Sequence, residues 1–115
     1  MKPTASEIRR WRLETARLKG RHTLEQWLML VFICRNQCVK CGFEFSPLSA
    51  HTRVQKDHIV PIYLGGSDGI ENLQPLCIRC NTKKTRDTTD YRPQFLKDAL
   101  LGGEIVVVPF EFANV

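Results

Sequence analysis

The amino-acid sequence predicts a single small α+β domain, on the evidence of its length, its apolar periodicity and its cysteines. The chain has 115 residues, of which 43% are hydrophobic and 25% are charged, and this matches one ordinary globular domain. Apolar residues recur at helical spacing early in the chain, and an alternating segment typical of a strand follows in the middle. Two Cys-x-x-Cys pairs flank that segment. Because burial alone stabilises a domain of this size only weakly, the cysteines are candidates for a stabilising metal site.

Two helices are expected before residue 36. The first covers residues 6–19, with Ser6 as its N-cap and Gly20 at its end. Thr23 can cap the second, which runs from residue 24 to about residue 35 and is largely apolar. The large aromatic side chains of both helices are expected to pack in the core rather than to stack on bases. These are Trp11, Trp27 and Phe32.

A hairpin and a helix are expected in the middle of the chain. Residues 52–60 alternate as a strand that ends at Pro61, residues 64–72 form a loop, and residues 73–76 return as a second strand. A helix then runs over residues 77–86. This order of elements is a ββα unit.

A short helix and a strand are expected at the C-terminal end. Pro93 opens the helix, which ends at the glycines that follow Leu101, and residues 104–112 form a strand that Pro109 interrupts. The edge of this strand could pair with a second copy of the chain, so a homodimer is one possible assembly. The expected single domain thus has three parts: a helical arm (1–35), a ββα core (38–86) and a C-terminal helix and strand (93–112).

Positive charge is concentrated at the N-terminus. The chain carries 17 basic and 12 acidic residues, a net charge of +5, and the first 21 residues account for this whole excess. Such an arm favours a polyanionic partner, with Arg9, Arg10 and Arg17 as expected contacts. A solvated helix face explains the same charges equally well.

The composition argues against a membrane protein and against a complete disulfide framework. The longest aliphatic stretches are much shorter than a bilayer span, and the first residues lack an apolar signal core. Five cysteines are an odd number, so at least one is left without a disulfide. We therefore expect a protein of the reducing cytoplasm.

The two cysteine pairs predict a structural zinc ion. Cys38 and Cys41 form one pair, and Cys77 and Cys80 form the other, so that four soft ligands can close a tetrahedral site. A redox pair or free thiols are the alternatives, but each pair here has a partner pair. Cys34 lies on an apolar helix end and is expected to be a small buried hydrophobe.

A second group of chemical residues lies between and after the cysteine pairs. Singly, a lone His, a Gly-Gly turn or an Asn before a strand is usually structural. The group comprises Asp57-His58-Ile59-Val60-Pro61, then Gly65-Gly66, then Asn72-Leu73-Gln74-Pro75-Leu76, then Cys77-Ile78-Arg79-Cys80-Asn81-Thr82-Lys83-Lys84. In this order, with the paired cysteines, these segments resemble the HNH endonuclease family in its zinc-containing treble-clef branch, over residues 38–86. The resemblance implies a treble-clef, ββα-metal core.

The expected hairpin brings two oxygen donors together. The first strand returns beside the following helix, so Asp57 and Asn81 can face each other. Such a pair suits a hard divalent cation such as Mg²⁺ and a phosphate oxygen. His58 alternates to the opposite side of the strand, where it is free to accept a proton.

The resemblance implies a role for each of these residues. His58 would be the general base that activates water, Asp57 and Asn81 would hold a catalytic Mg²⁺ or Mn²⁺, and Asn72 would fix the loop around His58. Asn81 stands where the family name has His, which makes the chain similar to His-Asn-Asn variants. An amide is a weak ligand for soft metals, so Mg²⁺ or Mn²⁺ is favoured over Zn²⁺ or Ni²⁺ at this site.

Basic residues on the third helix could contact flanking phosphates, although ordinary helix solubility explains them as well. These are Arg79, Lys83, Lys84 and Arg86. His22 and His51 have no partner at a recognisable spacing and are not assigned a role.

The sequence therefore predicts a metal-dependent endonuclease that cuts DNA, most plausibly double-stranded, and leaves 5′-phosphate and 3′-hydroxyl ends. The first alternative is a non-catalytic zinc module that binds nucleic acid or a protein partner. A binding module does not need Asp57, His58 and Asn81 together, so this alternative ranks lower. The second is an assembly protein that pairs through its C-terminal strand.

Overall fold

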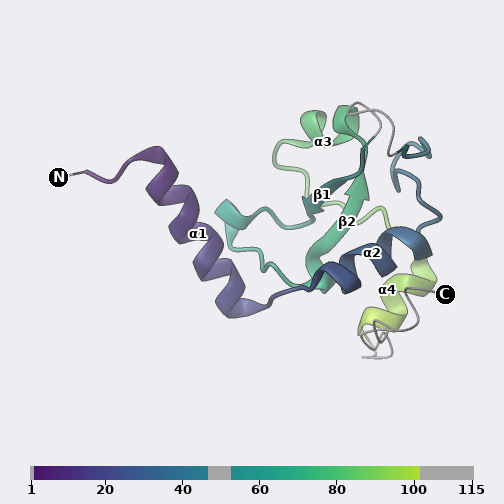
Figure 1. Ribbon diagram of the computed structural model, residues 1–115, viewed down its shortest axis with the longest axis horizontal. Coiled ribbons are helices and arrows are strands. Elements are labelled where there is room, and N and C mark those ends of the chain that lie inside the picture. Colours follow the sequence, from purple (N-terminus) through teal and green to yellow (C-terminus); the bar gives the residue numbers. More distant parts are fainter. Residues whose placement is uncertain (1, 47–52, 102–115) are drawn as a thin grey trace.

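The computed structural model describes residues 2–46 and 53–101, which fold as a small α+β structure. Figure 1 shows the two-stranded hairpin with helices at both of its ends and the first helix projecting to one side. The elements in chain order are α1 (Ala5–Lys19), α2 (Leu24–Ile33), β1 (Gln55–His58), the 3₁₀ turns η2 (Ile62–Leu64) and η3 (Ile70–Asn72), β2 (Leu73–Leu76), α3 (Ile78–Lys84) and α4 (Gln94–Leu101). The predicted fold class is confirmed.

Helix α1 begins one residue earlier than predicted. The side chain of Thr4, not of Ser6, caps it by accepting a hydrogen bond from the Glu7 amide at 3.1 Å. Gly20 ends the helix as predicted. Its buried side is small: Ala16 is buried, whereas Trp11 is 64% exposed and Leu18 is 85% exposed. The prediction that Trp11 packs in the core is therefore wrong, because α1 lies apart from the main body along most of its length (Figure 1).

Helix α2 supplies the main core. Thr23 caps it in a reciprocal arrangement with Gln26, each side chain accepting from the backbone amide of the other. Trp27 is buried as predicted, but Phe32 is 76% exposed, so the packing prediction is wrong for Phe32. The helix buries a different stripe of its surface against the hairpin and α4. This core cluster consists of Trp27, Leu30, Val31, Cys34, Leu73 and Leu96.

The hairpin is antiparallel and short. Its register pairs Gln55 with Leu76 and His58 with Leu73. The first strand is shorter than the predicted range of 52–60, because after His58 the chain turns away and its backbone bonds to Asn72 instead. The second strand has the predicted bounds.

Two further polar residues connect the hairpin to the segment before α4. Gln74 is completely buried, and its side chain binds the Thr89 carbonyl and the Tyr91 amide. Arg92 is buried too, paired with Asp90 at 2.7 Å, and it donates to the Leu73 carbonyl. These bonds satisfy backbone groups of the hairpin and of the segment before α4.

Helices α3 and α4 are both slightly shorter than predicted. Helix α3 ends at Lys84 rather than at Arg86, and α4 begins just after Pro93. The predicted strand over residues 104–112, its proposed dimer contact and His51 lie outside the described residues. Within the part of the chain that the structure describes, no helix is both long and apolar enough to cross a bilayer.

Candidate functional site

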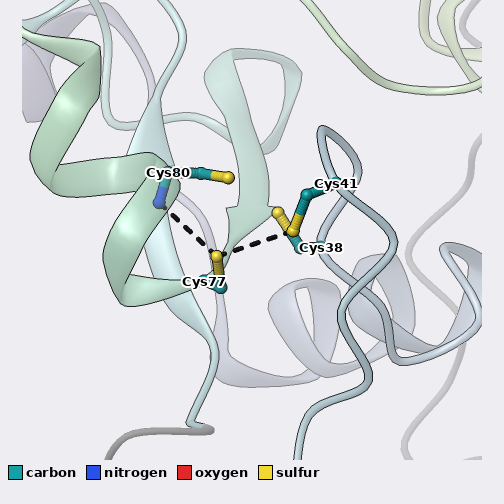
Figure 2. Close-up of side chains that lie close together, drawn as sticks. All are labelled: Cys38, Cys41, Cys77 and Cys80. Carbon is teal, nitrogen blue, oxygen red and sulfur yellow. Dashed lines mark hydrogen bonds between the residues drawn. The ribbon is translucent and has the colours of Figure 1, made fainter.

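The four paired cysteines converge on one point (Figure 2). Their sulfur atoms all lie within 4.8 Å of one another, and the Cys41 and Cys77 sulfurs are 3.8 Å apart. A tetrahedral zinc ion bound by about 2.3 Å bonds separates its sulfur ligands by about 3.8 Å. The arrangement therefore forms a possible zinc site, in donor type and in spacing.

Local backbone structure presents the first cysteine pair. The turn closes with the Gly42 amide bonded to the Cys38 carbonyl at 2.8 Å, and Gly42 adopts a φ of 80° that favours glycine. Burial alone would raise the pKa of the Cys38 thiol. Hydrogen bonds from the backbone amides of Cys41, Cys77 and Lys40 outweigh this effect, and the pKa is lowered to about 7. Amides that favour a thiolate suit a metal ligand.

The second cysteine pair belongs to the start of α3. The Cys77 sulfur caps the helix by accepting from the Cys80 amide at 3.4 Å. The Val39 amide binds the Pro75 carbonyl at 3.1 Å, so the turn of the first pair is bonded directly to β2. The first pair thus lies on a turn bonded to β2, and the second pair lies at the start of α3.

Cys34 does not belong to the cluster. It is buried in the main core beside Trp27 and Leu30. Burial raises the pKa of its thiol to about 11, so this side chain stays protonated. The prediction that Cys34 is a small buried hydrophobe is confirmed by its position.

Asn72 holds the loop that follows β1. Its side-chain oxygen accepts from the Val60 amide at 2.9 Å, and its side-chain nitrogen donates to the carbonyls of Val60 and Ser67. Gly66 allows this close approach, since a Cβ there would lie 1.8 Å from the Val60 carbonyl oxygen. This contact fixes the backbone just after His58.

His58 projects from the opposite face of β1 to Asp57, as the alternation predicts. Its Nε2 lies 2.9 Å from a carboxylate oxygen of Asp68, a buried residue of the same loop. The imidazole is partly exposed, with 24% of its side-chain surface accessible. Its Nδ1 makes no hydrogen bond within residues 2–46 and 53–101. One ring nitrogen is therefore anchored and the other is available.

Asp57 projects into the interior, where its carboxylate is already paired. The Lys84 ammonium lies 2.7 Å from one oxygen and 3.0 Å from the other, and Gln74 donates to the carboxylate at 2.8 Å. Lys84 also donates to the carbonyls of His58 and Ile59, and both charged side chains are buried. The prediction that Lys84 contacts phosphate is wrong, because its ammonium group is enclosed by these four acceptors.

Asn81 lies on α3 one helical turn before Lys84, and therefore on the same side of the helix. Helix α3 packs against β1, so Asn81 belongs to the element that covers Asp57. Its side chain makes no hydrogen bond to any residue that the structure describes. The lysine nevertheless occupies the carboxylate that an ion would need, so Asp57 and Asn81 do not form an open metal site in this conformation.

The other basic residues differ in their availability. Arg17 lies 3.5 Å from the Asp68 carboxylate, so part of its charge is used within the protein. The remaining ones that the sequence singles out are exposed: Arg9, Arg10, Arg79, Lys83 and Arg86. They lie on α1 and on or just after α3.

Three further residues organise the site and were not predicted from the sequence. Asp68 binds His58, Gln74 binds Asp57, and His22 binds the Asp68 carbonyl at 2.7 Å. No local spacing indicates these long-range contacts. The one available signal for Asp68 is its position between the Gly-Gly turn and Asn72, inside the segment that carries the resemblance.

Comparison with known proteins supports the identification of the central segment. Residues 38–87 match the family model described as HNH endonuclease. No curated protein and no solved structure matches the chain. The resemblance is thus confirmed for this segment, and the match does not distinguish the His-Asn-Asn subfamily, which stays a prediction.

Proposed function

We propose that this chain, which carries an HNH endonuclease domain in residues 38–87, is a metal-dependent endonuclease that hydrolyses phosphodiester bonds in DNA. The observation that carries the proposal is the state of His58. Its imidazole is partly exposed on a short hairpin, with Nε2 bound to Asp68 and Nδ1 without a partner among the described residues. That is the arrangement a general base requires.

His58 is proposed to take a proton from the water that attacks the phosphorus atom. A neutral imidazole accepts protons near neutral pH. The backbone around the ring is held on both sides, because Asn72 bonds the segment that follows His58 and the Lys84 ammonium donates to the His58 carbonyl. The ring is therefore presented by a fixed backbone rather than by a mobile loop.

Asp57 and Asn81 are proposed as the protein ligands of Mg²⁺ or Mn²⁺. A hard cation bound there would neutralise charge on the phosphate and on the departing 3′ oxygen. Because Lys84 pairs with the Asp57 carboxylate, its ammonium must first leave one oxygen of that carboxylate. Metal binding is thus proposed to replace the Lys84 ammonium at this carboxylate by a metal cation.

The cysteine cluster is proposed to hold one structural Zn²⁺. Cys38, Cys41, Cys77 and Cys80 supply the four thiolates, and the fit of their spacing to a tetrahedral ion supports this. The cluster lies away from His58, at the other end of the hairpin, where residue 76 pairs with residue 55. Its role is to hold α3, and hence Asn81, against the hairpin.

The exposed basic residues are proposed to bind the DNA backbone. Arg9 and Arg10 lie on α1, which projects from the body (Figure 1), and Arg79, Lys83 and Arg86 lie on or next to α3. Neutralising phosphates releases counterions and gives affinity without sequence preference. Double-stranded DNA, 5′-phosphate products and a cytoplasmic location belong to the same proposal.

One observation favours a second candidate, a zinc module that binds nucleic acid without cutting it. The Asp57 carboxylate is closed by Lys84 and Gln74, and a binding module would have no reason to open it. Supercoiled plasmid incubated with the zinc-loaded protein separates the two candidates. With Mg²⁺ or Mn²⁺ we expect nicked or linear product, and without either ion we expect none; binding without cleavage under all these conditions would support the second candidate.

A further inference from the structure

We infer that Asp68 is a positioning residue for His58, which holds the imidazole in the tautomer that carries its proton on Nε2 and leaves the lone pair on Nδ1. The inference rests on the proposed role of His58 as general base. It adds a residue that neither the family match nor the sequence spacing assigns.

The contact itself fixes the tautomer. The Nε2 atom lies 2.9 Å from Oδ1 of Asp68, and an ionised carboxylate can only accept a hydrogen bond. The proton of a neutral His58 ring must therefore lie on Nε2. Since a neutral imidazole has one N–H, Nδ1 keeps a free electron pair.

Asp68 is itself held firmly enough to orient a ring. It is 6% exposed, and its amide donates to the Ala16 carbonyl at 3.3 Å. Arg17 lies 3.5 Å from Oδ2 of Asp68, whereas His58 contacts Oδ1. The two partners therefore bind different oxygens of the same carboxylate. The carboxylate is thus supported from α1 while it contacts the imidazole.

The second histidine near Asp68 does not compete for the same role. His22 Nδ1 lies 2.7 Å from the Asp68 backbone carbonyl, which can only accept, so this nitrogen carries a proton. The Nε2 atom of His22 lies 2.9 Å from the Lys56 ammonium. Because an ammonium group can only donate, Nε2 is the acceptor in this contact. His22 therefore binds the backbone of Asp68, and its ring lies 3.6 Å from the carboxylate oxygen that binds His58.

These contacts join the basic arm to the hairpin. Helix α1 reaches the loop through Arg17 and Ala16, and Lys19 donates to the Gly65 carbonyl at 2.7 Å. Asp68 lies between this helix and His58. A residue that connects the proposed DNA-binding arm with the proposed base is well placed to hold the base in register with bound DNA.

The first test measures the tautomer without any need for cleavage. Long-range ¹H–¹⁵N NMR spectra of the zinc-loaded full chain, recorded at a pH where His58 is neutral, distinguish a protonated ring nitrogen from an unprotonated one. We expect His58 to show a protonated Nε2 and an unprotonated Nδ1. A protonated Nδ1, or an even mixture of tautomers, would overturn the inference.

The second test measures cleavage in Asp68→Ala. We expect kcat to fall by about 10- to 100-fold, the usual effect of removing a group that orients a functional histidine, with KM for DNA changed by less than about twofold. The matched control is Ser67→Ala, which loses the hydrogen bonds of the Ser67 hydroxyl with the Glu71 carboxylate and the Gly69 amide in the same loop but removes no contact of His58. Its kcat should stay near that of the unmodified protein.

A double variant separates positioning from general damage to the loop. If Asp68 acts through His58, adding Asp68→Ala to His58→Ala should cause no further loss of cleavage. Additive losses, or an equal loss in Ser67→Ala, would show that Asp68 has a structural role only. If the unmodified protein does not cleave at all, the proposed function fails, whereas the NMR result still decides the tautomer.

Discussion

Asp57 and His58 are neighbours on β1, yet their side chains enter opposite environments: the Asp57 carboxylate pairs with buried Lys84 at 2.7 Å, and the His58 imidazole binds Asp68 at 2.9 Å. The alternation of a strand sends the two side chains to opposite faces. The proposed base and the proposed metal ligand therefore have different partners. Each side of the hairpin can therefore be tested by its own variants.

Removing the partner of Asp57 should be strongly destabilising. Lys84→Met leaves a buried carboxylate with Gln74 as its remaining side-chain donor among the described residues. Such an unpaired buried charge costs about 3–5 kcal/mol of unfolding free energy, measurable by urea denaturation. The double variant Lys84→Met with Asp57→Asn should recover part of this loss. A loss below about 1 kcal/mol in the single variant would contradict the buried ion pair.

The same lysine variant tests whether Asp57 binds a metal. If Lys84 must leave the carboxylate before Mg²⁺ enters, then Mg²⁺ should raise the melting temperature of Lys84→Met more than that of the unmodified protein. Thermal denaturation with and without Mg²⁺ measures this. Asp57→Asn with Lys84→Met is the control and should show little response to Mg²⁺. An equal response in all three proteins would show that Asp57 does not bind Mg²⁺.

Loss of one cluster thiolate should release zinc and unfold the centre of the protein. Binding of a structural zinc ion can supply on the order of 10 kcal/mol of apparent folding free energy. We expect Cys77→Ser to lose its bound zinc, measured by atomic emission, and its cooperative unfolding transition. Cys34→Ala is the matched control, because Cys34 is buried outside the cluster, and it should keep one zinc per chain. Unchanged zinc content in Cys77→Ser would contradict the assignment.

The loop after β1 should depend on Asn72. Asn72→Ala removes three hydrogen bonds to the backbone of Val60 and Ser67. Each such bond contributes about 0.5–1.5 kcal/mol, so we expect a loss of about 2–4 kcal/mol. Hydrogen exchange should show that the Val60 amide loses protection. The Cys34 amide, which donates to the Leu30 carbonyl in the core, should exchange only through global unfolding. Unchanged protection at Val60 would show that the loop is held by other contacts.

The basic arm should contribute to the salt dependence of DNA binding. Replacing exposed Arg9 and Arg10 together by alanine should reduce the slope of log affinity against log salt by about 2, roughly one for each phosphate that the arm no longer neutralises. Arg17 is left in place because it pairs with Asp68. Leu18→Ser alters the same helix at an exposed, uncharged position and should leave the slope unchanged. An unchanged slope in the arginine variant would show that Arg9 and Arg10 form a solvated surface and do not contact DNA.

Local chemical rules predicted the parts of the fold that depend on neighbouring residues. The Thr23 cap, the Gly20 helix end, the second strand and the convergence of the cysteines follow from spacing and from the conformations that each residue favours. These features need no knowledge of what packs on them. The family resemblance was recognisable because each of its motif segments is a short run of residues and the segments follow one another in a characteristic order.

Features that depend on distant partners were missed. Lys84 has the pattern of a solvent-facing residue at a helix end, and its burial arises because Asp57 and two carbonyls lie opposite it. Trp11 has the helical spacing of a core residue, but α1 projects away from the body and leaves it exposed. Asp68 gains its partner through the fold of the loop rather than through spacing. Sequence periodicity records which face is apolar, not what covers that face.

The decisive experiment for His58 as general base is single-turnover cleavage of plasmid DNA by the His58→Ala variant. With Mg²⁺ present, we expect a cleavage rate about 10²- to 10⁴-fold below that of the unmodified protein, with DNA affinity, zinc content and unfolding free energy retained. Cleavage at the unmodified rate would contradict the assignment of His58 as the general base.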